Sequence, residues 1–162
     1  MKDHSSYMQL ALEEAKQAAL AGEVPVGAVL VLEDGQVFKA RNAPITLSDP
    51  SAHAEMLVIR EATKHVGNYR LTGSTLYVSL EPCLMCAGLL LQARVQTLVY
   101  AAPEPKTGAV HSLYQVLDDT RLNHQVEVIT PLLAEQSSSL LRCFFKERRA
   151  KHKKDKLLRH LK

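Results

Sequence analysis

Two short segments that lie far apart in the sequence most restrict how this chain can fold. The first is His53-Ala54-Glu55 and the second is Pro82-Cys83-Leu84-Met85-Cys86. One imidazole and two thiolates provide three ligands for a tetrahedral zinc ion, and the fourth position stays open for water, as in catalytic rather than structural zinc sites. We therefore expect the fold to bring His53, Cys83 and Cys86 together around zinc, with Glu55 nearby as a proton carrier.

Apolar periodicity and turn residues divide the chain into alternating helices and strands. Asp34-Gly35 is typical of a hairpin turn, and a loop with Pro44 and Pro50 follows the second strand. The predicted elements, in chain order, are a helix at 5–21, strands at 25–32 and 37–41, a helix at 51–65, a strand at 74–80, a helix at 83–94, a strand at 96–101, a short helix at 112–118, a strand at 126–130 and a long helix from 132.

This order of elements predicts a single α/β domain over residues 1–162. An antiparallel hairpin joined to strand–helix–strand crossovers gives a five-stranded mixed sheet with helices on both faces, which is a three-layer α-β-α architecture. Ser51 is expected to cap the helix that carries His53, and Pro82 is expected to open the helix that carries Cys83. Two helix N-termini would then meet at one edge of the sheet and share the metal.

The two cysteines of the second segment have alternative interpretations. A structural zinc site would need a fourth ligand, for which His65, His111 or His124 would have to be recruited in space. A redox Cys-x-x-Cys pair would leave the His-Ala-Glu segment as a coincidence. The third cysteine, Cys143, lies among apolar residues of the last helix, and we expect it to be a small buried hydrophobic residue.

Positive charge is concentrated at the C-terminal end. Residues 142–162 hold ten Lys or Arg and two acidic residues, a net charge of +8, whereas residues 1–141 carry a net charge of −5. A basic tail on an acidic body favours a polyanionic partner, although lysines at the end of a helix also complement its dipole. Neither a signal peptide nor a membrane-spanning run is visible, so we expect a cytoplasmic protein with no membrane partner.

The His-x-Glu and Pro-Cys-x-x-Cys segments resemble those of zinc deaminases that act on nucleobases. A finer similarity, from about Tyr7 to Arg149, is to the bacterial-type tRNA-specific adenosine deaminases of the cytidine deaminase-like superfamily. It rests on the zinc segments and on further blocks of sequence, which are residues 23–29, 68–71, 80–88, 106–109, 122–124, 144–145 and 148–149.

This resemblance implies a cytidine deaminase-like fold and a zinc-dependent hydrolase that converts adenosine to inosine at the wobble position of tRNA anticodons. One zinc ion per subunit would be held by His53, Cys83 and Cys86 and would make hydroxide available at neutral pH. Hydroxide would attack C6 of the purine while Glu55 carries protons to a ring nitrogen and to the departing ammonia. The implied partners are a tRNA anticodon stem-loop and a second copy of the chain in a homodimer.

Substrate-binding residues are also implied by the resemblance. The flipped base is expected near Val26, Asn42, Ala54 and Leu80, and the anticodon loop near Phe145, Arg148 and Arg149. Lys106 is a further expected substrate-binding residue. Asn42 would offer its amide to the purine edge, and its alternative role is that of a turn residue before Pro44. Of Phe144 and Phe145, we expect one ring to pack and the other to contact RNA.

The chain departs from the family pattern at two places. Glu104 stands where the family more often has Asp, which keeps a carboxylate but changes its reach. The basic run after Arg149 is a variable region, and our hypothesis is that it adds phosphate contacts. Two rival functions remain open from the sequence: a deaminase of a free base or nucleoside such as guanine or cytosine, and an RNA-binding module stabilised by zinc.

Overall fold

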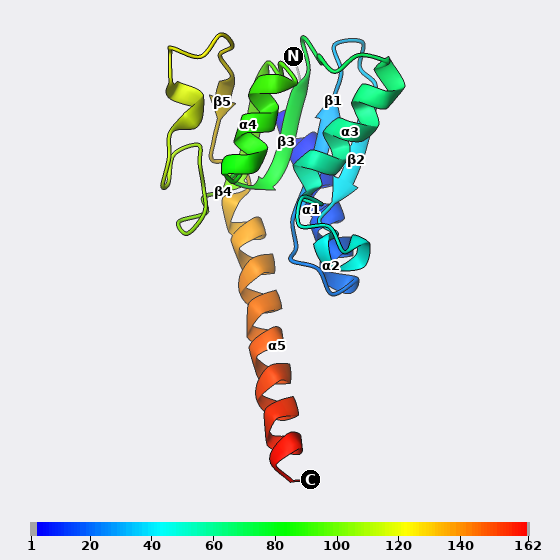
Figure 1. Cartoon of the computed structure of the whole chain (residues 1–162), viewed down its shortest axis with the longest axis vertical. Coiled ribbons are helices and arrows are strands. Elements are labelled where there is room, and N and C mark those ends of the chain that lie inside the picture. Colours follow the sequence, from blue (N-terminus) through cyan, green and yellow to red (C-terminus); the bar gives the residue numbers. More distant parts are fainter. Residues whose placement is uncertain (1–2, 162) are drawn as a thin grey trace.

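A five-stranded mixed sheet lies between two layers of helices (Figure 1). The computed structural model describes residues 3–161. The elements, in chain order, are α1 (His4–Leu20), β1 (Gly27–Val31), β2 (Val37–Arg41), α2 (Pro44–Leu47), α3 (Ala54–Val66), β3 (Thr75–Leu80), α4 (Leu84–Gln92), β4 (Thr97–Ala102), the 3₁₀ helix η1 (Val116–Asp118), β5 (Glu127–Ile129) and α5 (Ala134–His160).

The strand order is β2-β1-β3-β4-β5. The pairs β1–β2 and β1–β3 are antiparallel, and the pairs β3–β4 and β4–β5 are parallel. The mixed five-stranded sheet and the three-layer α-β-α architecture predicted from the sequence are therefore confirmed.

The two faces of the sheet carry separate apolar clusters, because successive strand residues point to opposite sides. Val29 and Tyr77 pack with Met8 and Leu12 of α1, on the face that also holds the start of α5. Leu30, with its neighbours on β3 and β4, packs against α3 and α4 on the other face. The two helices that begin at the zinc-binding segments thus lie side by side on one face of the sheet.

Helix α1 rests directly on β1 at Gly27. A Cβ atom at this position would overlap the backbone of Ala11 and lie 2.6 Å from the backbone nitrogen of Ala15. Only glycine allows two backbones to approach so closely. The Gly27 amide also donates to the side-chain oxygen of Ser79 on β3, at 3.1 Å, so the start of β1 is fixed from both sides.

Helix α3 begins at Ala54, and the predicted cap at Ser51 is wrong. The Ser51 hydroxyl donates instead to Asp49, at 2.7 Å, and His53 is the N-cap residue with an extended backbone. The side-chain oxygen of Asn42 accepts the Ala54 amide at 2.9 Å. The helix therefore takes its cap from a distant residue rather than from its own N-cap side chain.

Buried carboxylates organise two segments that the sequence pattern did not predict correctly. Glu23 accepts the Ile45 and Thr46 amides, which starts the short helix α2 where a loop was expected. Glu81 accepts the His111 and Ser112 amides, so that segment turns around the carboxylate. The helix predicted at 112–118 is accordingly reduced to the 3₁₀ turn at 116–118.

Helix α5 packs on the sheet with its first turns and then projects from the rest of the molecule (Figure 1). Residues 145–161 are all exposed. Cys143 is also exposed, which corrects the expectation that it is buried, because the helix is already leaving the body at this point. Within residues 3–161, no helix combines the length and apolarity needed to cross a membrane.

Candidate active site

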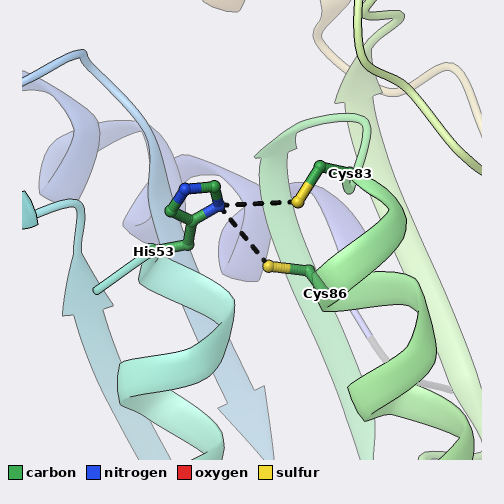
Figure 2. A group of neighbouring side chains, drawn as sticks. All are labelled: His53, Cys83 and Cys86. Carbon is green, nitrogen blue, oxygen red and sulfur yellow. Dashed lines mark hydrogen bonds between the residues drawn. The ribbon is translucent and has the colours of Figure 1, made fainter. Parts of the chain in front are cut away.

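The two zinc-binding segments meet at the N-termini of α3 and α4 (Figure 2). His53 is the N-cap of α3, Cys83 is the N-cap of α4, and Cys86 lies in the first turn of α4. The Nδ1 atom of His53 lies 3.6 Å from the sulfur of Cys83 and 3.6 Å from the sulfur of Cys86. The sequence prediction that these three side chains converge is borne out by this geometry.

These distances fit a tetrahedral zinc ion. Bond lengths of about 2.3 Å for Zn–S and about 2.0–2.1 Å for Zn–N place nitrogen and sulfur about 3.6 Å apart at the tetrahedral angle. The three ligand atoms all lie within 4.8 Å of one another. The donors, their chemistry and their spacing therefore match those of a zinc site with three protein ligands.

No fourth protein ligand joins this group among residues 3–161. His65 stacks on Phe38, His111 hydrogen-bonds to the Tyr100 hydroxyl, and His124 hydrogen-bonds to a backbone carbonyl. Each of the three histidines that a structural zinc site would have had to recruit is engaged elsewhere. The arrangement is that of a catalytic site with an open position.

The Glu55 side chain lies beside the metal ligands and is 4% exposed. Burial raises its pKa to about 7, because the charged carboxylate is poorly solvated in this environment. A carboxyl group with this pKa accepts and releases protons with similar ease at neutral pH, which suits a proton carrier. Glu55 is therefore equipped for the role that the sequence predicted.

Before a metal binds, the environment shifts the pKa values of the two cysteines in opposite directions. A hydrogen bond from Cys86, together with one from His53, lowers the pKa of Cys83 to about 4 even though burial opposes this. The same contact and burial raise the pKa of Cys86. Both sulfurs lie at the positive end of the α4 dipole, which favours thiolates, and a bound zinc ion deprotonates coordinating thiols outright.

A cavity of about 260 Å³ opens onto the metal ligands. Three residues predicted to hold the base, Val26, Asn42 and Leu80, line it, together with His53 and Glu55. Ala54, which was also predicted there, is buried and does not line the cavity. Its contribution is its backbone amide, which holds Asn42 in place.

Four lining residues received no role from the sequence. Val24, Pro44, Glu81 and Thr107 also border the cavity. The sequence did contain a signal for Glu81. A carboxylate at the end of a buried strand costs free energy unless it is hydrogen-bonded, so a structural role with hydrogen-bond partners could have been predicted. Pro44 lies in α2, whose position depends on tertiary contacts that the sequence pattern does not reveal.

Glu81 fixes the loop that closes one side of the cavity. Its carboxylate, 3% exposed, accepts the backbone amides of Glu104, Val110 and His111. Burial raises its pKa, but these bonds and one from the Ser112 hydroxyl outweigh burial and lower the pKa to about 2. Glu81, charged at neutral pH, thus anchors the loop next to Cys83.

Gly108 completes this anchor. A Cβ atom at Gly108 would overlap the carboxyl group of Glu81 and lie 2.5 Å from the carbonyl oxygen of Glu104. Gly108 also forms a β-bridge with Cys83, so the loop contacts the metal ligand directly. The close packing of carboxylate, loop backbone and ligand explains why the segment 106–109 needs glycine at this position.

An open groove of about 780 Å³ adjoins the cavity and shares Leu80 and Glu104 with it. Lys106, Phe145 and Arg149, three of the residues predicted to meet RNA, line this groove. The Glu104 carboxylate accepts the Lys106 amide at 2.9 Å, so it is used within its own loop.

Arg148, the fourth of these residues, does not line the groove. Its guanidinium lies over the Phe144 ring, 5.7 Å from the centroid. Phe144 is half-buried and Phe145 is 39% exposed, which agrees with one packed ring and one available ring.

Comparison with known proteins places these observations in a family. Residues 1–102 match the model of the cytidine and deoxycytidylate deaminase zinc-binding region. The chain is 47% identical to the tRNA-specific adenosine deaminase of Haemophilus influenzae over 152 residues, covering 93% of this chain and 88% of the relative.

Two solved structures share the fold. One comes from a study of adenosine-to-inosine editing by tRNA deaminases at the wobble position; it is 44% identical, with a TM-score of 0.80, and the match covers 84% of this chain and 99% of the other. The second is guanine deaminase from Bacillus subtilis, at 31% identity and a TM-score of 0.61, covering 92% of this chain and 95% of that protein. Together with the metal ligands and Glu55, these similarities establish that the chain belongs to the cytidine and deoxycytidylate deaminase family and, within it, to the group of the tRNA-specific adenosine deaminases.

Proposed function

We propose that this protein hydrolyses the exocyclic amine of adenosine at the wobble position of a tRNA anticodon, which gives inosine and ammonia. The relative at 47% identity, which bears the name of this activity, supports the assignment. The whole chain would act as one deaminase domain, and the tRNA substrate implies that it works in the cytoplasm.

The groove beside the catalytic cavity is the observation that carries this proposal. It leaves the cavity at Leu80 and Glu104 and is lined by the cations Arg142, Lys146 and Arg149. A free base needs only the enclosed cavity, whereas a base that is part of an RNA needs an adjoining surface for the rest of the strand. A basic groove in this place supplies such a surface.

The residues of the cavity have distinct roles in this reaction. When bound, zinc supplies a Lewis acid that activates water at neutral pH. Glu55 takes a proton from the water whose oxygen bonds to C6 and delivers it to a ring nitrogen. It then carries the remaining proton of the added hydroxyl to the amine, so that the C–N bond breaks and ammonia leaves. Asn42 offers its amide NH₂ group to the purine edge, while Val26 and Leu80 form apolar walls around the ring.

The RNA loop would contact the groove and the adjacent face of α5. Phe145 offers an exposed ring on which an unstacked base can lie, which is a common mode of recognition in single-stranded RNA. Lys106, Arg148 and Arg149 supply positive charge around it. These contacts position the strand, and the cavity accepts only the flipped base.

The protein would act as a homodimer. Exposed apolar side chains lie on two segments that adjoin the bridge between Cys83 and Gly108: Leu84 and Met85 in α4, and Leu113 and Tyr114 in the loop. A monomer rarely leaves such a surface open beside its active site. The molecular mass in solution, measured by light scattering, tests this; a monomer at micromolar concentration would contradict it.

The test of the function is inosine formation by zinc-loaded protein in an anticodon stem-loop with a wobble adenosine. Free adenosine and guanine serve as comparison substrates. Glu55→Gln should keep its zinc and lose activity by about 10²–10⁴-fold, the usual contribution of a positioned proton carrier. Glu61→Gln, the same change at an exposed position of the same helix, should behave like the wild type.

The alternatives give different results in this assay. Deamination of guanine without inosine formation in the stem-loop would identify a free-base deaminase, the activity named for the relative at 31% identity. A protein that holds zinc, binds the RNA and is inert toward every substrate would be an RNA-binding module.

A further inference from the structure

Helix α5 carries a row of five cations along one face. Arg142, Lys146, Arg149, Lys153 and Lys156 are spaced alternately by four and three residues. Side chains at these spacings lie above one another on the same side of a helix. With a rise of about 1.5 Å per residue, the row is about 21 Å long.

The row begins at the active-site groove and continues beyond it. Arg142, Lys146 and Arg149 line the groove that shares Leu80 with the catalytic cavity. Arg149 also borders a second hollow, of about 460 Å³, which Lys153 and Lys156 line farther along the helix. A continuous basic track therefore leads from the groove beside the catalytic cavity to the projecting part of α5, drawn in orange and red in Figure 1.

Most of this charge is uncompensated within the protein. Arg142 pairs with Glu135 at 2.6 Å. None of the other four cations has an ion-pair partner in the part of the chain that the structure describes. Glu147 and Asp155, the two acidic residues of this stretch, occupy other faces of the helix.

We propose that the outer half of this track, Lys153 and Lys156, binds phosphates of the paired stem of the RNA whose loop enters the active site. The proposal rests on the proposed function, because the flipped base fixes the loop at the cavity and groove. Lys156 lies about 10 Å beyond Arg149 along the helix, outside the groove that would hold the loop. Paired RNA is contacted mainly through its backbone, which suits two flexible ammonium groups.

The helix offers a matched control outside the track. Lys151 and Lys154 belong to the same turns, and each lies about 100° or more around the helix axis from Lys153 and Lys156. Lys153→Ala/Lys156→Ala and Lys151→Ala/Lys154→Ala therefore remove the same charge from the same stretch. Because alanine is the best helix former, neither double variant weakens the helix.

The experiment measures binding of zinc-loaded, full-length protein to two labelled RNAs at several salt concentrations. One RNA is the anticodon stem-loop, and the other is a linear strand with the same loop sequence. For the stem-loop, Lys153→Ala/Lys156→Ala should weaken binding roughly tenfold to thirtyfold and flatten the slope of log K against log salt by about 1 per lysine. Binding of the linear strand should change little, and the control variant should bind both RNAs nearly as the wild type does.

Three results would overturn the proposal. Equal losses in both double variants would mean that only the net charge of the tail matters, and equal losses on both RNAs would place the contacts in the loop. Wild-type protein that fails to bind the stem-loop would also refute it. If the wild type binds the stem-loop and Lys153→Ala/Lys156→Ala shows the expected loss, but no inosine forms, the proposed stem contacts stand. Only the proposed reaction is then refuted.

Discussion

The side-chain oxygen of Asn42 accepts the backbone amide of Ala54, the residue between His53 and Glu55, at 2.9 Å. One asparagine therefore caps the helix that presents a metal ligand and the proton carrier. Because the oxygen is used in this way, the NH₂ group is the part of Asn42 left for a base in the cavity, which Asn42 lines. The sequence suggested either a substrate contact or a turn residue before Pro44 for Asn42. The cap of α3 is a third role, and it leaves the NH₂ group for the predicted substrate contact.

Replacing Asn42 with Asp should separate these two roles. Aspartate keeps the oxygen that caps α3 but loses the NH₂ donor, so the folded protein and its zinc should be retained. We expect kcat/KM for the stem-loop to fall about tenfold to a hundredfold, because an unpaired polar group in a buried site costs about 1–3 kcal/mol. Steady-state kinetics, zinc content and urea unfolding measure the three quantities.

Asn42→Ala is the companion variant, because it removes the cap as well as the donor. It should lose about 0.5–2 kcal/mol of unfolding free energy, the usual cost of deleting a helix cap. Wild-type kcat/KM in the aspartate variant would show that the NH₂ group makes no contact with the substrate.

Zinc removal should lower the stability of the protein without unfolding it. The metal site lies at the N-termini of α3 and α4, on one face of the sheet, and both apolar clusters are built from protein side chains alone, unlike the core of a zinc finger. Bound zinc stabilises only the folded state, by about 1.4 kcal/mol for each tenfold excess of free zinc over its dissociation constant. Thermal melting followed by circular dichroism, with and without a chelator, should show a lower Tm for the metal-free protein.

Cys86→Ala is the matched variant for this experiment, since Cys86 is fully buried and contributes one of the three ligands. It should hold far less zinc, and its Tm should be insensitive to the chelator. Loss of all secondary structure on chelation would contradict this prediction and show that the fold depends on zinc.

The sequence predicted what local patterns encode. Apolar periodicity predicted the strands of the sheet and its main helices. The residue types and spacing of the two short segments predicted His53, Cys83 and Cys86 as metal ligands. The sequence missed features that depend on contacts between distant segments, such as α2, which begins where the Glu23 carboxylate accepts two amides. The cap of α3 was misplaced for the same reason, because Asn42 reaches it from another loop.

The burial of residues along α5, and the face on which its charges lie, also depend on contacts between distant segments. Ten basic residues in the C-terminal stretch were evident from the sequence. Which of them share a face with the active-site groove depends on how the helix packs on the sheet, and only its first turns do so. Cys143 was expected to be buried because its neighbours are apolar, yet the helix has left the body where that residue lies.

Glu81→Gln should loosen the loop beside the metal site. Glutamine replaces one accepting oxygen with a donor that faces backbone amides, so at least one buried amide loses its partner at a cost of about 1–3 kcal/mol. Urea unfolding should show this loss, and hydrogen exchange should be faster at the amides of Val110 and His111. Activity should fall as well, because Glu104 and Thr107 of this loop line the cavity.

Glu147→Gln, the same change at an exposed position of α5, is the control and should leave stability within about 0.5 kcal/mol of the wild type. Unchanged exchange at Val110 and His111 in Glu81→Gln would mean that the loop holds its shape without the carboxylate.

The stability conferred by Glu23 should depend on pH. This carboxylate is 2% exposed, and burial raises its pKa, but hydrogen bonds from Thr46 and Ile45 and the charge of Arg148 outweigh burial and lower the pKa below its usual value. A depressed pKa in the folded state means that the unfolded chain binds the proton first. The contribution of Glu23 is therefore present in full above its unfolded pKa and is lost as the pH falls through its folded pKa.

Glu23→Gln isolates this effect from that of other carboxylates. The difference in unfolding free energy between wild type and variant should be largest near neutral pH and should shrink as the pH is lowered from about 7 to about 3. Urea unfolding of both proteins across this range measures the difference. A difference that stays constant with pH would mean that the charge of Glu23 is not what stabilises α2. In that case the neutral amide of the variant would accept the Ile45 and Thr46 amides equally well at every pH.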